Sequence, residues 1–176
     1  MKINGKLDTK RSHRIIQFFL ERAKNWNADD RDFSICWSIS HMISTAQIIR
    51  LLALKRGLDV EICAIAGAIH DIATMESGKA ENHATRAIDY IAPLINEYNE
   101  SKHAKNGTLA ITDEEIALLE EIIPQHCSKE VLSTHPYVEI LKDADTIDRY
   151  LHGVETREME QPRLFAVLAE LGFDVN

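Results

Sequence analysis

Apolar residues recur every three or four positions along most of the chain, which is the spacing of an amphipathic α-helix. The longest pattern covers about residues 34–56, and Ile35, Ile39 and Met42 begin its apolar face. The pattern over about 60–73 is apolar on almost every side, which favours a helix at the centre of the fold. We predict about six or seven helices and no strand, over residues 12–24, 34–56, 60–73, 80–98, 112–126, 136–151 and 162–171.

Residues typical of helix ends support these boundaries. Gly57 follows the second pattern, as glycine commonly does just past a helix. Asp59 occupies the N-cap position of the third pattern. Thr112 and Glu115 have the spacing of a capping box, and Pro136 suits the first turn of a helix.

The composition is that of an ordinary globular protein. The chain has 176 residues, 45% of them hydrophobic and 27% charged, which suits one domain with a sizeable core. We therefore expect an all-α, single-domain helical bundle over residues 1–176. Its motif-bearing core lies within about 34–151, and the helices at about 12–24 and 162–171 pack on that core.

Charge and cysteine content exclude some functions. The formal net charge is -8 and no Lys/Arg cluster stands out, so we expect no nucleic-acid partner, whereas a small anionic substrate remains possible. No apolar run reaches membrane-spanning length, and the first residues, MKINGKLDTK, lack the apolar segment of a secretion signal. Cys36, Cys63 and Cys127 show no CxxC spacing and are interpreted as core thiols, so we expect a cytoplasmic protein.

The apolar stretch AIAGAIHDIA contains His70 and Asp71 side by side. A buried carboxylate costs several kcal/mol unless hydrogen bonds or a cation compensate it. Neighbours on a helix diverge by roughly 100°, so this pair suits two ions better than one. A carboxylate can bridge two ions that are roughly 3.5–4 Å apart.

Other polar residues also lie on apolar helix faces. His41 lies in the middle of the second pattern, and His83 shares a stripe with Ala87 and Ile91. His126 and Asp145 extend the apolar faces of the fifth and sixth patterns. Five helices thus direct a His or Asp to the interior, and imidazoles and carboxylates converging in a bundle core are what a metal site needs.

These residues and their order resemble the HD-domain superfamily of metal-dependent phosphohydrolases. SHMISTAQIIRLLAL resembles the helix of the first histidine, AGAIHDIA the central motif, and LKDADTIDRYL the helix of the last aspartate. The resemblance implies that one divalent ion is held by His41, His70, Asp71 and Asp145. His83 and His126 match the two additional histidines of members with two metals, so a second ion would be held by Asp71, His83 and His126, with Asp71 as the bridge.

The resemblance implies hydrolysis of a phosphate ester, from a nucleotide or similar small molecule, by a metal-activated water. Manganese, iron, cobalt, nickel and zinc all suit such ligands. Lys79, Arg86 and Arg149 are candidate phosphate-binding cations or ordinary surface residues. Glu76, together with Lys79 and Asp71, is a candidate catalytic residue, although Glu76 is equally plausible as a loop carboxylate.

Asp148 either orients a metal ligand or pairs with a neighbouring cation at the surface.

The sequence departs from the family pattern at two places, and the second excludes one class of substrate. Ala73-Thr74 stands where many members have Gly-Lys, and the extension typical of the cyclic-dinucleotide phosphodiesterases is missing. Two other functions remain open: a di-iron oxygenase with the same ligands, and a non-catalytic helical domain that senses a nucleotide.

Overall fold

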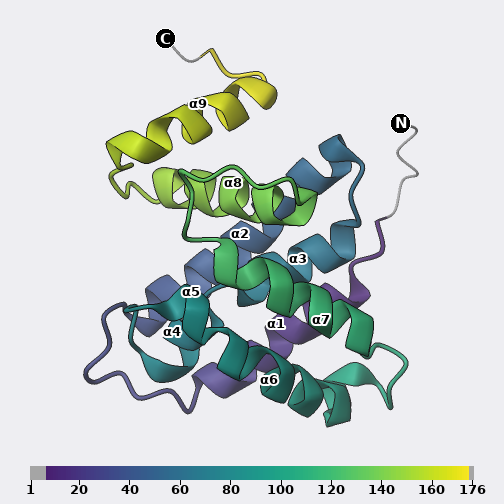
Figure 1. Cartoon of the computed structure of the whole chain (residues 1–176). Coiled ribbons are helices and arrows are strands. Elements are labelled where there is room, and N and C mark those ends of the chain that lie inside the picture. The colour runs from purple at the N-terminus through teal and green to yellow at the C-terminus, as the bar shows by residue number, and fades with distance from the viewer. Residues whose placement is uncertain (1–6, 175–176) are drawn as a thin grey trace.

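The computed structural model describes residues 7–174, in which every regular element is helical (Figure 1). This confirms the predicted all-α class. The α-helices are α1 (Lys10–Ala23), α2 (Ile35–Arg56), α3 (Val60–Ile69), α4 (Ile72–Ser77), α5 (His83–Arg86), α6 (Ile88–Glu100), α7 (Asp113–Ile122), α8 (Pro136–Leu151) and α9 (Gln161–Glu170). Short 3₁₀ turns cover Lys102–Ala104 (η1), Ile123–Gln125 (η2) and Glu158–Glu160 (η3).

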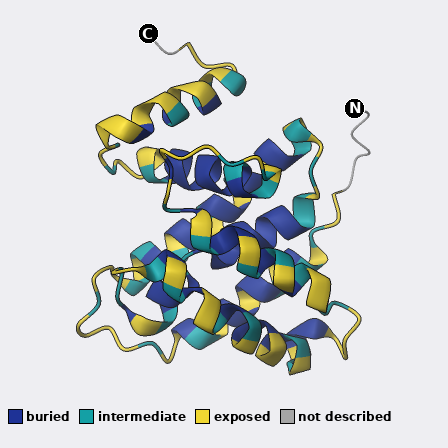
Figure 2. Cartoon of the chain, viewed as in Figure 1, coloured by how far each residue is buried: buried dark blue, intermediate teal, exposed yellow. Residues whose placement is uncertain are grey.

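Helix α3 lies at the centre of the bundle, in contact with α1, α2 and α8. Every residue from Ile62 to Ile69 is buried, as the all-round apolar pattern predicts (Figure 2). A Cβ atom on Gly67 would lie 3.0 Å from Ile49 Cγ2 and 3.3 Å from Ala46 Cα. The small residues of this stretch therefore let the backbones of α3 and α2 approach closely.

The predicted helix ends are confirmed at three places. Gly57 adopts the left-handed conformation, with φ 71°, after α2. The side chain of Asp59 accepts hydrogen bonds from two backbone N–H groups of the first turn of α3. Thr112 and Glu115 form the expected capping box of α7.

Three helices that we predicted as continuous are interrupted. The pattern over 60–73 divides into α3 and α4, because Asp71 leaves helical geometry with φ -94° and ψ 21°. The pattern over 80–98 divides into the single turn α5 and the longer α6. The pattern over 112–126 ends as an α-helix at Ile122 and tightens into η2. The first interruption lies at His70-Asp71 and the third leads directly to His126, while the second lies four residues after His83.

Two further details of the fold did not follow from the sequence pattern. In the polar segment 99–107, α6 continues to Glu100 and the buried ring of His103 packs edge-on against Phe18, 6.0 Å between centroids. Among the cysteines only Cys63 is buried, while Cys36 is exposed and Cys127 partly exposed.

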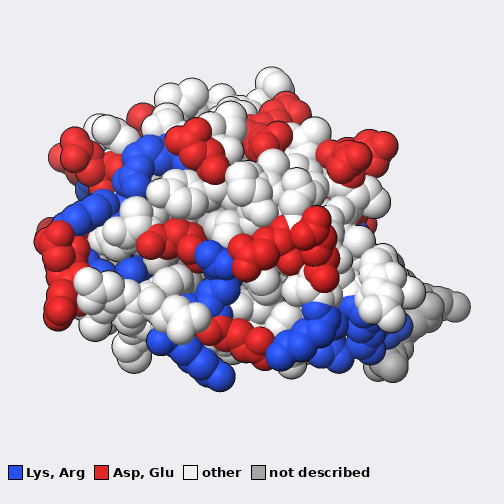
Figure 3. Space-filling model, turned by 90° about the horizontal axis from the view of Figure 1, so that it is seen from below, with Lys and Arg blue, Asp and Glu red and all other residues white. Residues whose placement is uncertain are grey.

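Acidic and basic side chains are interspersed on the face of the molecule seen from below (Figure 3). Within residues 7–174 no helix combines the length and apolar character needed to span a bilayer.

Candidate metal centre

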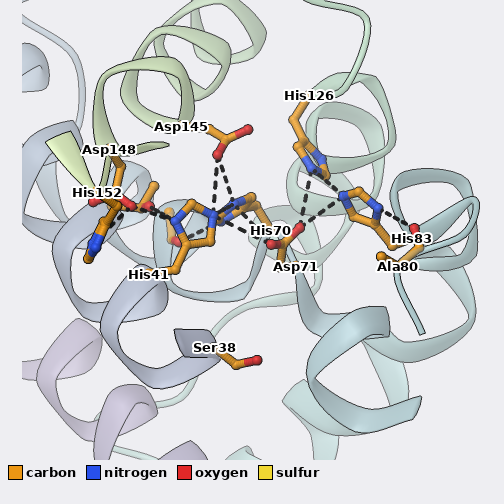
Figure 4. A network of polar contacts seen from close by, with 12 residues as sticks. Ser38, His41, His70, Asp71, Ala80, His83, His126, Asp145, Asp148 and His152 are labelled. Atoms are coloured by element: carbon orange, nitrogen blue, oxygen red, sulfur yellow. Dashed lines mark hydrogen bonds and ion pairs between the residues drawn. The ribbon is translucent and has the colours of Figure 1, made fainter. Parts of the chain in front are cut away.

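The six predicted ligands converge in the interior of the bundle (Figure 4). Three helices and two breaks between helices supply the six side chains. His41 comes from α2, Asp145 from α8 and His83 from the start of α5. The break between α3 and α4 supplies His70 and Asp71, and the end of η2 supplies His126.

The four imidazoles form two pairs on opposite sides of Asp71. The Nε2 atoms of His41 and His70 are 3.0 Å apart, and those of His83 and His126 are 3.1 Å apart. Asp71 directs Oδ2 to the first pair, 3.4 Å from His41 Nε2, and Oδ1 to the second pair, 3.0 Å from His83 Nε2. Each oxygen of this carboxylate therefore faces a different pair of imidazoles.

The other ring nitrogen of each histidine already has a partner. The Nδ1–H groups of His70, His83 and His126 donate to the backbone carbonyls of Gly67, Ala80 and Ile123, at 2.7–2.8 Å. A carbonyl can only accept a hydrogen bond, so Nδ1 carries the proton in the neutral ring and the Nε2 lone pair points into the site. The backbone thus sets the tautomer that a metal ligand requires.

Asp148 has the corresponding role for His41. Its Oδ2 lies 2.5 Å from His41 Nδ1, with both side chains almost fully buried. Asp148 therefore orients a candidate ligand and does not form a surface ion pair. Trp37 stacks on the ring of His41, 5.7 Å between centroids, and the ring of His152 meets Trp37 edge-on.

The donor set requires a cation. Facing Nε2 lone pairs 3.0–3.1 Å apart repel each other unless a proton or a metal ion lies between them. Within the described part of the chain, Asp71 Oδ1 and Asp145 Oδ1 are buried and accept no hydrogen bond of ordinary geometry. Four imidazoles and two carboxylates with free lone pairs fit a divalent transition metal.

The pKa shifts of the candidate ligands also indicate that the site favours positive charge. Burial would lower the pKa of His83, but its contacts with Asp71 and Cys127 raise the pKa to about 11. The pKa of His126 rises to about 9, because the same two partners outweigh burial. For Asp71, burial is outweighed by the surrounding imidazoles, which hold the pKa well below its usual value. The carboxylates and the thiol thus favour a positive charge at this position, which a divalent ion would supply.

Lys129 belongs to this centre, although no sequence pattern indicated it. Its Nζ lies 2.5 Å from Asp145 Oδ2, and the side chain is almost fully buried. The carbonyl of Lys129 accepts a hydrogen bond from Arg163 Nε, which fixes the loop that carries the lysine. One oxygen of Asp145 is thus neutralised by Lys129, while the other faces His41 at 3.2 Å.

Cys127 also lies at the centre and is not the core thiol that we expected. Its Sγ is 3.3 Å from His83 Nε2 and 3.4 Å from His126 Nε2. Burial would raise the pKa of this thiol, but the two imidazoles lower it to about 6. The sequence gave no sign of this role, because it depends on the path of the chain after η2.

A cavity of about 180 Å³ opens beside the ligands. Arg149 lines it, together with the aromatic residues Phe33 and Trp37. Among the described residues, Arg149 has no hydrogen-bonding or ion-pair partner for its guanidinium group. It is therefore the predicted cation that the structure leaves available to a ligand.

The other predicted substrate residues are engaged elsewhere and do not line this cavity. Glu76, the candidate catalytic carboxylate, accepts hydrogen bonds from Arg22 at 2.7 Å and 3.1 Å. Lys79 pairs with Asp30 at 2.8 Å. Arg86 donates to Ser77 and to the backbone carbonyls of residues 79 and 81, so it stabilises the loop before α5.

The ordered ligands and the helical bundle agree with the comparison to known families. The family model of the HD domain matches residues 38–150, more than half of the chain. The chain belongs to the HD domain family. This family consists of metal-dependent phosphohydrolases and related proteins, and the match confirms the resemblance found in the sequence. No curated protein sequence matches the chain at a significant level.

A solved structure shares the fold of this HD domain. It is a predicted HD superfamily hydrolase from an uncultured Thermotogales bacterium, and the two chains superpose with a TM-score of 0.56 at 21% sequence identity. The alignment covers 90% of the present chain and 88% of the other. The similarity therefore extends beyond the motif-bearing helices to most of the bundle.

Proposed function

We propose that this HD domain protein is a phosphohydrolase that binds two divalent ions and cleaves a phosphate ester of a nucleotide or similar small molecule. The observation that carries the proposal is the position of Asp71. Its two oxygens face two separate imidazole pairs, so one carboxylate can serve two ions. A single-ion site would give the second pair, His83 and His126, no comparable role.

The first ion would be held by His41, His70, Asp71 and Asp145, and the second by Asp71, His83 and His126. A pair of divalent ions, when bound, lowers the pKa of coordinated water and offsets the charge that develops on phosphate oxygens. The protein's own contribution is to fix the ligands. Asp148 holds the His41 ring, and Lys129 neutralises the outer oxygen of Asp145.

The cavity favours a substrate with one phosphate and a flat group. Arg149 offers an unpaired guanidinium beside Asp145, which suits a phosphate oxygen. The cavity is smaller than a typical ligand pocket of roughly 300–1,000 Å³, so it fits the phosphate end of a nucleotide. Phe33 is 43% exposed at this cavity, where its ring can stack on a base.

The test is metal analysis followed by anaerobic assays of phosphate release from nucleoside monophosphates. We expect two ions per chain, and close to one in His83→Ala. Arg149→Met should raise KM at least about tenfold with metal content unchanged, because a charge-assisted contact is worth roughly 1.5–3 kcal/mol. Arg14→Met, which alters a cation on α1 far from the ligands, is the matched control and should leave KM unchanged. A fully metal-loaded protein that releases no phosphate from any ester would refute the proposal.

The same donors suit iron, so a di-iron oxygenase is the second candidate. Iron in the purified protein, together with oxygen consumption and no anaerobic hydrolysis, would favour it over the hydrolase.

A further inference from the structure

Cys127 lies where a further ligand of the second ion would lie. Its Sγ and the Nε2 atoms of His83 and His126 form a triangle with sides of 3.1, 3.3 and 3.4 Å. Zinc-like ions bind nitrogen at 2.0–2.1 Å and thiolate sulfur at about 2.3 Å, so tetrahedral ligand atoms are about 3.3–3.6 Å apart. The triangle matches one face of such a tetrahedron, contracted by a few tenths of an ångström at most.

Asp71 borders the two imidazoles of this triangle. Its Oδ1 lies 3.0 Å from His83 Nε2 and 3.5 Å from His126 Nε2, and it accepts no hydrogen bond of ordinary geometry among the described residues. The three donors of the triangle lie within 4.8 Å of one another, and Asp71 Oδ1 is within reach of both imidazoles.

A thiol hydrogen bond alone does not account for this arrangement. A neutral thiol has one proton and can donate to only one of the two Nε2 atoms that it touches, whereas a thiolate can face both, across imidazolium protons or across a metal ion. The backbone also favours joint ligation. His126 and Cys127 follow the 3₁₀ turn η2 rather than lying within a helix, so their adjacent side chains can face the same point.

We propose that Cys127 binds the second ion as a thiolate, and the inference rests on the two-ion function proposed above. Binding of the ion releases to solvent the protons that Cys127, His83 and His126 carry without it. The two ions then occupy unlike positions, because the first has nitrogen and oxygen ligands only, while the second adds sulfur. Thiolate selects zinc, cobalt and cadmium over manganese and magnesium, so the second position discriminates among metals and the first does not.

The test is reconstitution of the metal-free protein with cobalt(II), followed by near-ultraviolet absorption spectroscopy and metal analysis. Wild type should show a thiolate-to-cobalt charge-transfer band that reaches full intensity at two ions per chain. Cys127→Ser should lose the band, whereas Cys36→Ser, which alters an exposed thiol on α2, should retain it. Cys127→Ser should also reduce the preference of the second position for cadmium over manganese by at least about tenfold, measured by competition.

The outcomes separate this inference from the proposed function. Two cobalt ions bound to wild type without the band would overturn the role of Cys127 and leave the two-ion hydrolase intact. A band that survives in Cys127→Ser would also overturn it. A protein that binds no cobalt at all would overturn both. The wild-type spectrum decides the question even if the serine variant fails to fold.

Discussion

Replacement of Asp148 tests whether a residue that touches no ion controls the metal site. Its Oδ2 accepts from His41 Nδ1 at 2.5 Å, and the two side chains are 1% and 5% exposed. A hydrogen bond to a charged group is worth roughly 1.5–3 kcal/mol, and a tenfold change in affinity corresponds to about 1.4 kcal/mol. We therefore expect Asp148→Ala to weaken binding of the first ion about 10–100-fold, and Asp148→Asn to lie at the lower end of this range.

The assay is calorimetric titration of the metal-free protein, with Asp143→Asn as the matched control. Asp143 lies on the same helix but pairs with Arg56 and Arg163, so its replacement should change stability and leave metal affinity unchanged. Asp148 is also among the carboxylates that raise the pKa of His41, so protons compete more strongly with metal in wild type. The difference in metal affinity between wild type and the Asp148 variants should thus be smaller at about pH 6 than at about pH 8. Equal affinity in wild type and Asp148→Ala would refute the reasoning.

Two further predictions concern stability. Gly67→Ala should lower the free energy of unfolding by up to about 2 kcal/mol, measured by denaturant titration. Overpacking against Ile49 and Ala46 costs roughly 1–3 kcal/mol, which exceeds the roughly 1 kcal/mol gain in helix propensity. A more stable variant would contradict the close approach of α2 and α3. Burial would raise the pKa of Glu139, but hydrogen bonds, including one from Arg163, lower the pKa. The ionised carboxylate therefore stabilises the fold above its unfolded pKa of about 4.3, and this contribution is lost as the pH falls. Glu139→Gln should therefore lose less stability than wild type between about pH 5 and pH 3, and parallel pH curves would contradict this assignment.

The periodicity of apolar residues was sufficient to predict the all-α class, and the polar residues on apolar faces were sufficient to choose the six side chains that converge. Burial of a His or Asp costs free energy, so such a residue on an apolar face indicates a functional or structural role even when only the sequence is known. The surface cations lacked such a signal. Lys79 and Arg149 look alike in the sequence, and only the fold shows that Lys79 pairs with Asp30 while Arg149 lines the cavity.

The helix interruptions were less accessible to sequence analysis. Pro124 was a usable signal, since proline has no N–H for the helix and marks the place where α7 gives way to η2. The break at Asp71 had no such marker, because the apolar pattern continues on both sides of it. Lys129 and Cys127 were missed for a related reason. Their positions depend on the irregular path after η2, which periodicity does not describe.

These interruptions explain how adjacent residues can share one centre. Within an α-helix, neighbouring side chains diverge by roughly 100°, which led us to expect that His70 and Asp71 suit two ions better than one. The chain leaves the helix at this dipeptide, and His70 Nε2 and Asp71 Oδ2 lie 3.8 Å apart, close enough for one ion. His126 and Cys127 show the same arrangement after η2, with Sγ and Nε2 3.4 Å apart. The two dipeptides lie at helix ends because only there can consecutive side chains converge, so the breaks are a requirement of the site.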